Sequence, residues 1–234
     1  MAPSQLLPTT ALLGRSNVRF NQGHLVPTQQ PTTLSLTKRT DYYEQRCVKF
    51  PYRGTFHCYA EFIHALLLEA DHEVTSFVPQ PYKLEVNRRF YIPDVYVVRR
   101  GRIQVLELKP GGKFEQEMEV PLTAFFDQYG MSFEVLANET VLNQEQLALN
   151  WLPIIQILAQ AQAQGIDTQL EEQRLFDAAR AEDAVAVGEL LGEVSRYNRY
   201  WQELALYRLL HRHDMSCDLS EAPLDYDTVI SAWN

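Results

Sequence analysis

The sequence predicts an α/β protein in which a mixed β-sheet lies between helices and a mostly helical, winged-helix-like part follows. Two observations carry this expectation. Amphipathic stretches alternate with short runs of β-branched and aromatic residues over 55–137, whereas the chain becomes helical and acidic after residue 146. We therefore expect three segments: an arm over 1–45, a core domain over 46–145 and a C-terminal domain over 146–234.

The arm and the start of the core differ in composition. Residues 1–45 are rich in Pro, Thr, Gln and Asn and show no sustained periodicity, which is typical of a segment that becomes ordered on a partner. From Thr55 a helix is expected, because apolar side chains then recur at i, i+3 and i+4 as far as Ala70. Glu61 falls beside that apolar stripe, where a carboxylate can reach toward a packed sheet.

A run of strands follows this helix. Pro93 cannot donate a ladder hydrogen bond, so Asp94 should lie at the start, the edge or a bulge of its strand. The break at Pro110-Gly111-Gly112 ends the last strand of the run, and Gly130 ends the helix that comes next. The expected order is strands over 74–78, 82–86, 88–98 and 103–109, a helix over 115–129 and a strand over 132–137.

The C-terminal segment is interpreted as several helices and a small β element. Pro153 should lie in the first turn of the helix that begins at Trp151, because proline is tolerated there. Helices followed by a β wing indicate a winged-helix-like module, although a simple helical subdomain would give the same pattern. The expected helices cover 151–163, 170–179, 184–194 and 197–211, and the β element follows Asp214.

Composition restricts the class of protein. Hydrophobic residues make up 46% of the chain, which suits a globular fold, and no run of eighteen apolar residues could cross a membrane. The first fifteen residues do not form a signal-peptide pattern, so a cytosolic protein is expected. Cys47, Cys58 and Cys217 are widely spaced, which suits isolated thiols in a reducing compartment better than disulfides or a zinc site.

The most informative residues lie on two neighbouring strands. Side chains at i and i+2 of a strand point to the same face, so Glu107 and Lys109 should project together. If the strands on either side of the Arg99–Arg102 turn pair as a hairpin, Asp94 lies beside them. Such a pattern usually indicates a surface hairpin whose charged side chains are solvated. Here apolar residues occupy both faces of the second strand, so its charged side chains are expected to be buried. Burying a charge costs free energy, which makes charges without a function unfavourable at these positions.

Carboxylates and an ammonium in one pocket suit a divalent cation, a water molecule and a phosphate. Mg²⁺ or Mn²⁺ prefers carboxylate oxygens and can activate water for phosphodiester hydrolysis. We expect Asp94 to be the central ligand and to bridge two ions. Glu107 and the backbone carbonyl of Leu108 would hold one ion, and Glu61 would complete the other. Lys109 should stay charged beside them, where it can orient the attacking water or stabilise developing negative charge.

Charge is distributed unevenly along the chain. The net charge is −9, but the first 58 residues carry seven basic and only two acidic side chains, whereas residues 147–234 carry six and fourteen. The acidic end favours a protein-binding role over the reading of DNA bases. Strong DNA binding by the isolated chain is therefore not expected. The candidate phosphate contacts are Lys49, Arg53 and Lys113, although the stretch 46–54 could equally be a solvated basic loop.

Pro93-Asp94 and Glu107-Leu108-Lys109 resemble the motif of the PD-(D/E)xK nuclease superfamily. Within that superfamily the chain is similar to the TnsA family of transposon-end endonucleases, well over roughly residues 46–137 and loosely over 146–234. The resemblance implies a restriction-endonuclease-like core, with a mixed sheet flanked by helices, and a C-terminal winged-helix part. The further segments that carry it are Tyr59–Phe62, Val74–Tyr82, Tyr91–Asp94, Val105–Pro110 and Leu204–Leu210, with Asp218-Leu219 and Pro223-Leu224.

The resemblance also implies an activity and partners. A TnsA protein is a Mg²⁺-dependent endonuclease of the bacterial cytoplasm that cleaves DNA at the 5′ ends of a transposon, while a DDE-type transposase, TnsB, cuts and joins the 3′ ends. Docking to the AAA+ regulator TnsC through the C-terminal region is implied as well. The compact size suits a CRISPR-associated transposon. In TnsA proteins the carboxylate before the lysine is sometimes glutamine, whereas Glu107 follows the wider superfamily.

Two other interpretations stay open. A restriction or repair nuclease of the same superfamily would act alone, but the acidic C-terminal half argues against independent capture of DNA. A non-catalytic adaptor with a degenerate nuclease fold would bind a regulator, but the complete acidic set and Lys109 argue against it. Cleavage of generic DNA by the lone protein would favour the first. A structure soaked in Mn²⁺ with no ion near Asp94 would favour the second.

Overall fold

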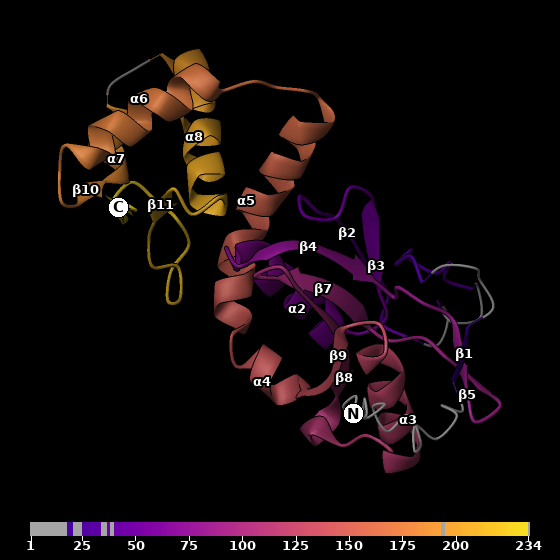
Figure 1. The fold of residues 1–234 in the computed structure, drawn as a ribbon. Helices are drawn as coiled ribbons and strands as arrows, with labels where there is room; N and C mark the ends of the chain where they lie inside the picture. The colour runs from indigo at the N-terminus through magenta and orange to yellow at the C-terminus, as the bar shows by residue number, and fades with distance from the viewer. Residues whose placement is uncertain (1–17, 21–24, 34–36, 38–39, 193–194, 234) are drawn as a thin grey trace, which may run out of the picture.

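The computed structural model describes residues 18–20, 25–33, 37, 40–192 and 195–233. It is an α/β structure in which helices cover a mixed sheet and a further group of helices with a small sheet follows (Figure 1). The strands are β1 Val18–Phe20, β2 Tyr43–Arg46, β3 Arg53–Phe56, β4 Val74–Pro79, β5 Leu84–Val86, β6 Arg89–Tyr91, β7 Val95–Arg99, β8 Arg102–Lys109, β9 Met131–Ala137, β10 Val185–Ala186, β11 Met215–Ser216 and β12 Val229–Ala232. The helices are α2 Tyr59–Ala70, α3 Gln116–Asp127, α4 Asn138–Leu142, α5 Glu145–Ala163, α6 Gln169–Arg180, α7 Val187–Leu191 and α8 Arg196–His211, with a 3₁₀ turn η1 at Pro110–Gly112.

The central sheet contains the predicted hairpin. Its strands are ordered β4-β7-β8-β9, and β9 runs parallel to β8 while the other pairs are antiparallel. Arg99 pairs with Arg102, so only two residues turn the chain between β7 and β8. Those residues, Arg100 and Gly101, have φ values of +50° and +72°, which is the geometry of a two-residue hairpin turn. The expected pairing of the two strands is therefore confirmed.

Each face of the central sheet is covered by one helix. Leu106 of β8 belongs to the apolar cluster that contains Leu68 of α2. Its neighbour Val105 belongs to the cluster that contains Leu122 and Phe126 of α3. Because successive side chains of a strand point to opposite faces, the apolar run of β8 is buried on both sides. This confirms the expected sheet between helices.

The described part of the predicted arm is attached to the core. β1 pairs with β5 in a small sheet that also contains β6, and β2 and β3 form a separate two-stranded hairpin. Further along, the backbone amides of Thr28 and Gln30 donate to the carbonyl oxygens of Pro81 and Gln80, at 2.9 and 3.0 Å. The rest of the arm prediction, including residues 1–17, lies outside the described residues.

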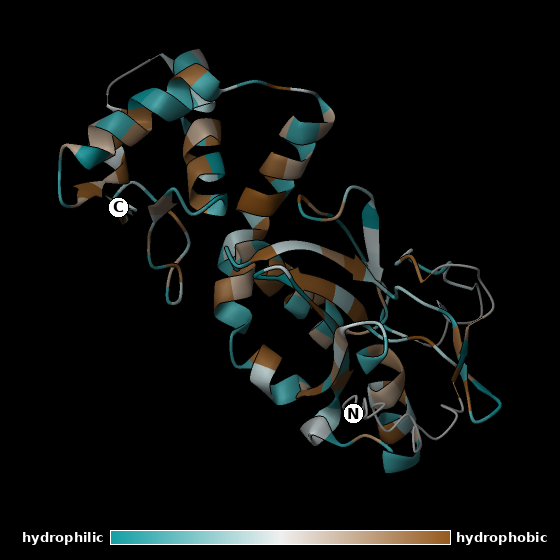
Figure 2. Ribbon diagram, in the orientation of Figure 1, coloured by the Kyte–Doolittle hydropathy of each residue, from teal (hydrophilic) through white to brown (hydrophobic). Residues whose placement is uncertain are grey.

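The C-terminal part shares a hydrophobic core with α2. α5 packs along α2, and one cluster of buried side chains extends from Ile63 of α2 through Ile155 to Leu206 and Ile230. Hydrophobic and hydrophilic stretches alternate along α5, α6 and α8, as in amphipathic helices (Figure 2). β11 and β12 supply the β element expected after Asp214, in a sheet ordered β10-β12-β11. The winged-helix assignment and the domain boundaries stay predictions.

The start of α2 differs from the prediction. The helix was expected from Thr55, but Thr55 pairs with Glu44 in the β2–β3 hairpin and the helix begins at Tyr59. Cys58 has extended backbone angles, and its Sγ accepts a hydrogen bond from the Glu61 amide at 3.4 Å. A side-chain acceptor at this position satisfies one of the free amides of the first turn, so the helix begins immediately after it.

The predicted start of α5 is also wrong. α5 begins at Glu145, so Pro153 lies inside the helix and not in its first turn. A proline inside a helix removes one backbone hydrogen bond and clashes with the preceding turn. Burial of Ala148 and Trp151 opposes that cost, because both side chains pack in the core shared with α2.

The helix expected over 184–194 is shorter than predicted. Val185 and Ala186 pair with β12 as β10, and only Val187–Leu191 is helical. None of the helices in the described ranges has both the length and the apolar character needed to cross a lipid bilayer.

Candidate active site

The four predicted site residues come together from three elements. Glu61 lies in the first turn of α2, Asp94 stands directly before β7, and Glu107 and Lys109 lie on β8. The antiparallel register of β7 and β8 places Asp94 beside Glu107. Glu61, Asp94 and Leu108 line a cavity of about 10 Å³, which is about the size of one water molecule. Residues 48 positions apart in the sequence thus meet at one end of the hairpin.

Asp94 is held by the backbone of the neighbouring strand. Its Oδ2 accepts a hydrogen bond from the Leu108 amide at 2.7 Å. Its own carbonyl oxygen accepts from the Gln80 amide at 2.8 Å, so the residue is attached to β8 and to the end of β4 at once. Pro93 stands just before β7 and leaves the ladder of β7 intact, as expected from its missing N–H.

Glu107 and Lys109 project from the same face of β8. Lys109 Nζ lies 2.5 Å from Glu107 Oε1, and the Glu107 side chain is only 3% exposed. The other carboxylate oxygen, Oε2, accepts a hydrogen bond from the hydroxyl of Tyr91 at 2.6 Å. The Lys109 ammonium also lies 5.8 Å from the centre of the Phe114 ring, within cation–π range. Glu107 is therefore fixed from two sides, and the i, i+2 expectation for β8 is confirmed.

The pKa values of the site residues are shifted because several acids and one cation lie close together. Burial, then the charges of Glu107 and Glu61, raise the pKa of Asp94 well above its ordinary value. Burial likewise raises the pKa of Glu107, although Lys109 offsets part of that effect. Burial alone would lower the pKa of Lys109, but attraction by Glu107, Asp94 and Glu61 raises it above its ordinary value. Lys109 is therefore expected to remain an ammonium ion.

Glu61 is fixed by two donors. Its Oε2 accepts a hydrogen bond from the His57 amide at 3.0 Å and another from Gln80 Nε2 at 2.9 Å. The side chain belongs to the first turn of α2, where the free amides of a helix favour a carboxylate. The two donor residues directly follow β3 and β4 in the sequence.

The donor set suits a divalent cation, although the acids are turned toward protein partners. Among the described residues, no three acidic, histidine or cysteine groups converge closely enough to hold a metal ion as they stand. Three carboxylates nevertheless share the site with one ammonium, and burial together with the charges of Glu107 and Glu61 raises the pKa of Asp94. Oxygen ligands with excess negative charge are what Mg²⁺ and Mn²⁺ bind. Asp94, Glu107, Glu61 and the carbonyl of Leu108 therefore fit such an ion chemically.

The three predicted DNA-contacting cations lie in different settings. Lys49 Nζ donates to the carbonyl oxygens of Leu68, Glu69 and Asp71 at 2.7–3.0 Å, which caps the C-terminus of α2. Arg53 pairs with Glu44 at 2.9 Å on the exposed β2–β3 hairpin. Lys113 is exposed directly after η1, close in sequence to Lys109. Of the three, Lys49 has a clear structural role, and the DNA contacts stay predictions.

Sequence reasoning missed two residues that hold the acids in place. Tyr91 and Gln80 contact Glu107 and Glu61 directly, and neither was among the predicted site residues. Tyr91 could have been predicted to contact a polar site residue. It lies in a segment that was expected to be a packed strand, and a buried tyrosine hydroxyl needs a hydrogen-bond partner. Gln80 gave no such signal, since a glutamine beside two prolines is typical of an ordinary turn.

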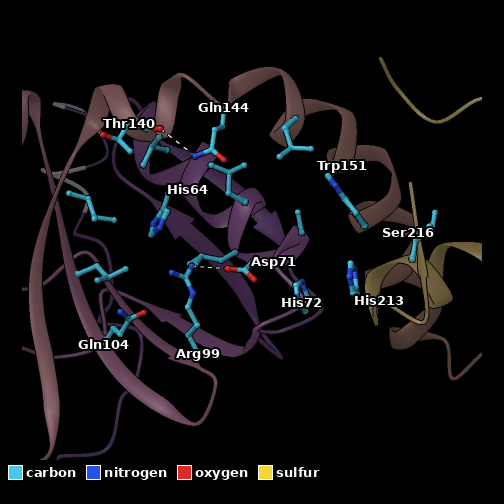
Figure 3. Close-up of a pocket in the computed structure, with 18 of the residues that line it drawn as sticks. His64, Asp71, His72, Arg99, Gln104, Thr140, Gln144, Trp151, His213 and Ser216 are labelled. Carbon is cyan, nitrogen blue, oxygen red and sulfur yellow. Dashed lines mark hydrogen bonds and ion pairs between the residues drawn. The ribbon is translucent and has the colours of Figure 1, made fainter. Parts of the chain in front are cut away.

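A second and larger cavity lies away from these residues. It has a volume of about 440 Å³ and is lined by α2, the central sheet, α4, α5 and the end of α8 (Figure 3). Its polar groups include the ion pair of Arg99 with Asp71, at 2.9 Å, and the stacked rings of His72 and His213, whose centres are 4.0 Å apart. None of the predicted site residues lines it. His64 and Leu68 of α2 line both cavities.

Comparison with known proteins does not identify the chain. It matches no protein-family model, and no curated protein sequence matches it.

Proposed function

We propose that this protein is a metal-dependent DNA endonuclease. The observation that carries the proposal is the convergence of Asp94, Glu107 and Lys109 at one end of the β7–β8 hairpin, with Glu61 facing them from α2. Nothing in the packing of the core requires three acids there, and their burial raises the pKa of Asp94 and Glu107. Perturbed ionisable groups clustered in one place favour a functional site over a structural one.

The residues of the chain divide the chemistry between them. Asp94, Glu107, Glu61 and the Leu108 carbonyl would hold Mg²⁺ or Mn²⁺, with Asp94 as the central ligand. The metal would activate a water molecule and stabilise negative charge on the phosphate. Lys109 keeps its proton, so its ammonium can bind the scissile phosphate or orient the attacking water. Tyr91 keeps Glu107 from turning away, since its hydroxyl donates to Oε2 at 2.6 Å.

A basic and aromatic hairpin next to the site supports a nucleic-acid substrate. β5 and β6 are joined by a two-residue turn, and Lys83, Arg88 and Arg89 are all exposed on this hairpin. Phe90 is 71% exposed, with Lys83 Nζ 4.7 Å from the centre of its ring. The next residue is Tyr91, which contacts Glu107. Cations that neutralise phosphates and a ring that stacks on bases are the usual elements of such an interface.

We base the proposed substrate and partners on the resemblance to TnsA proteins. We propose that the DNA is a transposon end, cut at its 5′ side, and that a DDE-type transposase of the TnsB kind acts on the other strand. The acidic C-terminal part, with fourteen acidic side chains against six basic ones over 147–234, favours a protein partner such as an AAA+ regulator of the TnsC kind. This division of roles explains how a chain of net charge −9 can act on DNA.

The proposal is tested with Asp94→Asn, which keeps the side-chain shape and an oxygen for the Leu108 amide. Strand cleavage at labelled transposon ends, with the partner transposase and regulator present, is expected to fall by at least about 100-fold. Mn²⁺ binding, measured by calorimetry, should weaken in parallel. Asp127→Asn, at the exposed end of α3, is the matched control and should cleave as the wild type does.

The outcomes separate the alternatives. Undiminished cleavage by Asp94→Asn refutes the active-site assignment. Efficient cutting of generic DNA by the wild type alone supports a stand-alone nuclease and refutes the partner-dependent role. A wild-type protein that binds no Mn²⁺ and cleaves nothing, while still binding the regulator, supports a non-catalytic adaptor.

A further inference from the structure

The N-terminal segment reaches the candidate site through a chain of hydrogen bonds. Gln29 Nε2 lies 3.1 Å from Gln80 Oε1, and Gln80 Nε2 in turn donates to Glu61 Oε2 at 2.9 Å. Gln29 also donates to the carbonyl oxygen of Thr55 at 3.1 Å and to its Oγ1 at 2.9 Å. The residues involved are up to 51 positions apart in the sequence.

The direction of this chain is fixed at both ends. The Thr55 carbonyl and the Glu61 carboxylate can only accept hydrogen bonds, so each must face an NH₂ group. Gln29 therefore presents its NH₂ end to Thr55 and Gln80. Because that group donates to Gln80 Oε1, the amide of Gln80 cannot flip without losing the bond, and its own NH₂ end stays on Glu61.

The same segment also contacts the second donor to Glu61. The His57 amide donates to Glu61 Oε2, and the His57 ring is hydrogen-bonded to Thr32 Oγ1 at 2.9 Å. Between these two contacts the backbone of Gln30 donates to the Gln80 carbonyl at 3.0 Å. Residues 28–32, which we call the strap, therefore touch both groups that hold the Glu61 carboxylate.

Gln80 is also unusual in its backbone. It is 3% exposed and has a φ of +41°, a left-handed conformation that a residue with a side chain adopts at a cost. Its amide meanwhile donates to the Asp94 carbonyl. One residue is therefore attached to Asp94 by its backbone and to Glu61 by its side chain. Strain kept at such a position is characteristic of sites where placement of a group matters.

We propose that Gln80 is the positioning residue of the Glu61 carboxylate, and that the strap locks its amide in the orientation that Glu61 requires. The inference rests on the proposed function in that Glu61 is taken as a metal ligand. In this proposal the side chain of Gln80 is not a metal ligand and acts through Glu61. Gln29 supplies this lock through its side chain, so a residue 51 positions from Gln80 in the sequence takes part in the site.

The test compares three methionine variants, which have similar size but no amide. Mn²⁺ affinity, measured by calorimetry on the full chain, should fall at least about tenfold in Gln80→Met. It should fall by a smaller factor in Gln29→Met, which acts one step further away. Gln30→Met is the matched control, because the half-buried Gln30 side chain bonds the Thr28 carbonyl and the substitution keeps the backbone amide that donates to Gln80. Its affinity should stay within about twofold of the wild type.

A second readout needs no metal. The side-chain NH₂ resonances of Gln80 should exchange slowly with water and shift in Gln29→Met but not in Gln30→Met. Wild-type Mn²⁺ affinity in a folded Gln80→Met overturns the inference, and if that variant does not fold, an unchanged Gln29→Met overturns it. A wild type that binds no Mn²⁺ refutes the metal site of the proposed function. In that case the Gln80 resonances alone decide whether the strap positions the amide.

Discussion

A buried hydrogen bond between a carboxylate and an imidazole joins the central part of the protein to α8, and we expect the contacts of that carboxylate to carry a large part of the stability. Glu69, at the end of α2, accepts from the amides of Val48 and Lys49 at 2.8 and 2.9 Å through Oε1. Its Oε2 lies 2.9 Å from Nε2 of His211 in α8. The two side chains are 1% and 8% exposed. Water therefore cannot replace any of these contacts without a rearrangement.

Glu69→Ala leaves two backbone amides and an imidazole without a partner. Each buried group without a partner costs about 1–3 kcal/mol. We therefore expect the free energy of unfolding to fall by about 4 kcal/mol. Glu69→Gln keeps an oxygen for the amides and an NH₂ group for the imidazole, so it should cost about 1 kcal/mol.

Urea denaturation followed by tryptophan fluorescence measures this effect. Trp151 is a suitable probe, because its ring centre lies 6.5 Å from that of His211. Glu73→Ala is the control: Glu73 pairs with Arg100, whose side chain is 72% exposed, and such pairs contribute less than about 1 kcal/mol. A loss below about 1 kcal/mol in Glu69→Ala, or equal losses in the alanine and glutamine variants, would contradict the reasoning.

Two further predictions concern titration. Burial, and then the charge of Arg99, lower the pKa of His64 to about 4. The unfolded chain, with a pKa near 6.5, binds the extra proton, so stability should be lost as the pH falls from about 6.5 toward 4. Between pH 7 and 5 the wild type should therefore lose about 2 kcal/mol that His64→Met does not lose, as measured by urea melts of both proteins at both pH values. An identical pH dependence of the two proteins would refute this prediction. Burial, and then Asp218, raise the pKa of Cys217 to about 11, so its alkylation by iodoacetamide at pH 8 should be about 100-fold slower than that of an unfolded thiol. Mass spectrometry would detect the alternative, which is rapid labelling of native Cys217.

The sequence was most informative where the determining contacts are local. The β7–β8 hairpin depends on a two-residue turn containing Gly101 and on alternation along β8, and both are visible in the sequence. Because the period of a strand is two, the joint projection of Glu107 and Lys109 followed without any tertiary information. The start of α5 could not be found in this way. Gln144 at its N-cap makes no side-chain capping bond, so the sequence carries no start signal.

Contacts between distant segments were not predictable from patterns. Lys49 was a candidate phosphate contact because it lies in a basic stretch, and no pattern in the sequence indicated that its ammonium caps the C-terminus of α2. That arrangement depends on how the loop before β3 folds over the helix. The hydrogen bonds of Gln29 and Tyr91 depend likewise on which segments meet in space. Residue type alone showed that these groups could donate, but not to which acceptor.

The distribution of exposed cations determines whether the proposed nuclease needs a partner to reach DNA. Beside the candidate site, Arg89 lies 3.4 Å from Glu115 and Arg53 pairs with Glu44, so each brings its own counter-charge. Lys109 is committed to Glu107, which leaves Lys83 and Arg88 as the principal free charges of the β5–β6 hairpin. Binding through only two phosphates gives a weak and salt-sensitive complex. If the proposed function holds, stable placement of DNA on this chain therefore depends on a protein bound beside it. Replacing Arg88 removes one phosphate contact and so lowers the salt dependence of cleavage, and the loss of cleavage that it causes should be largest at low salt concentration.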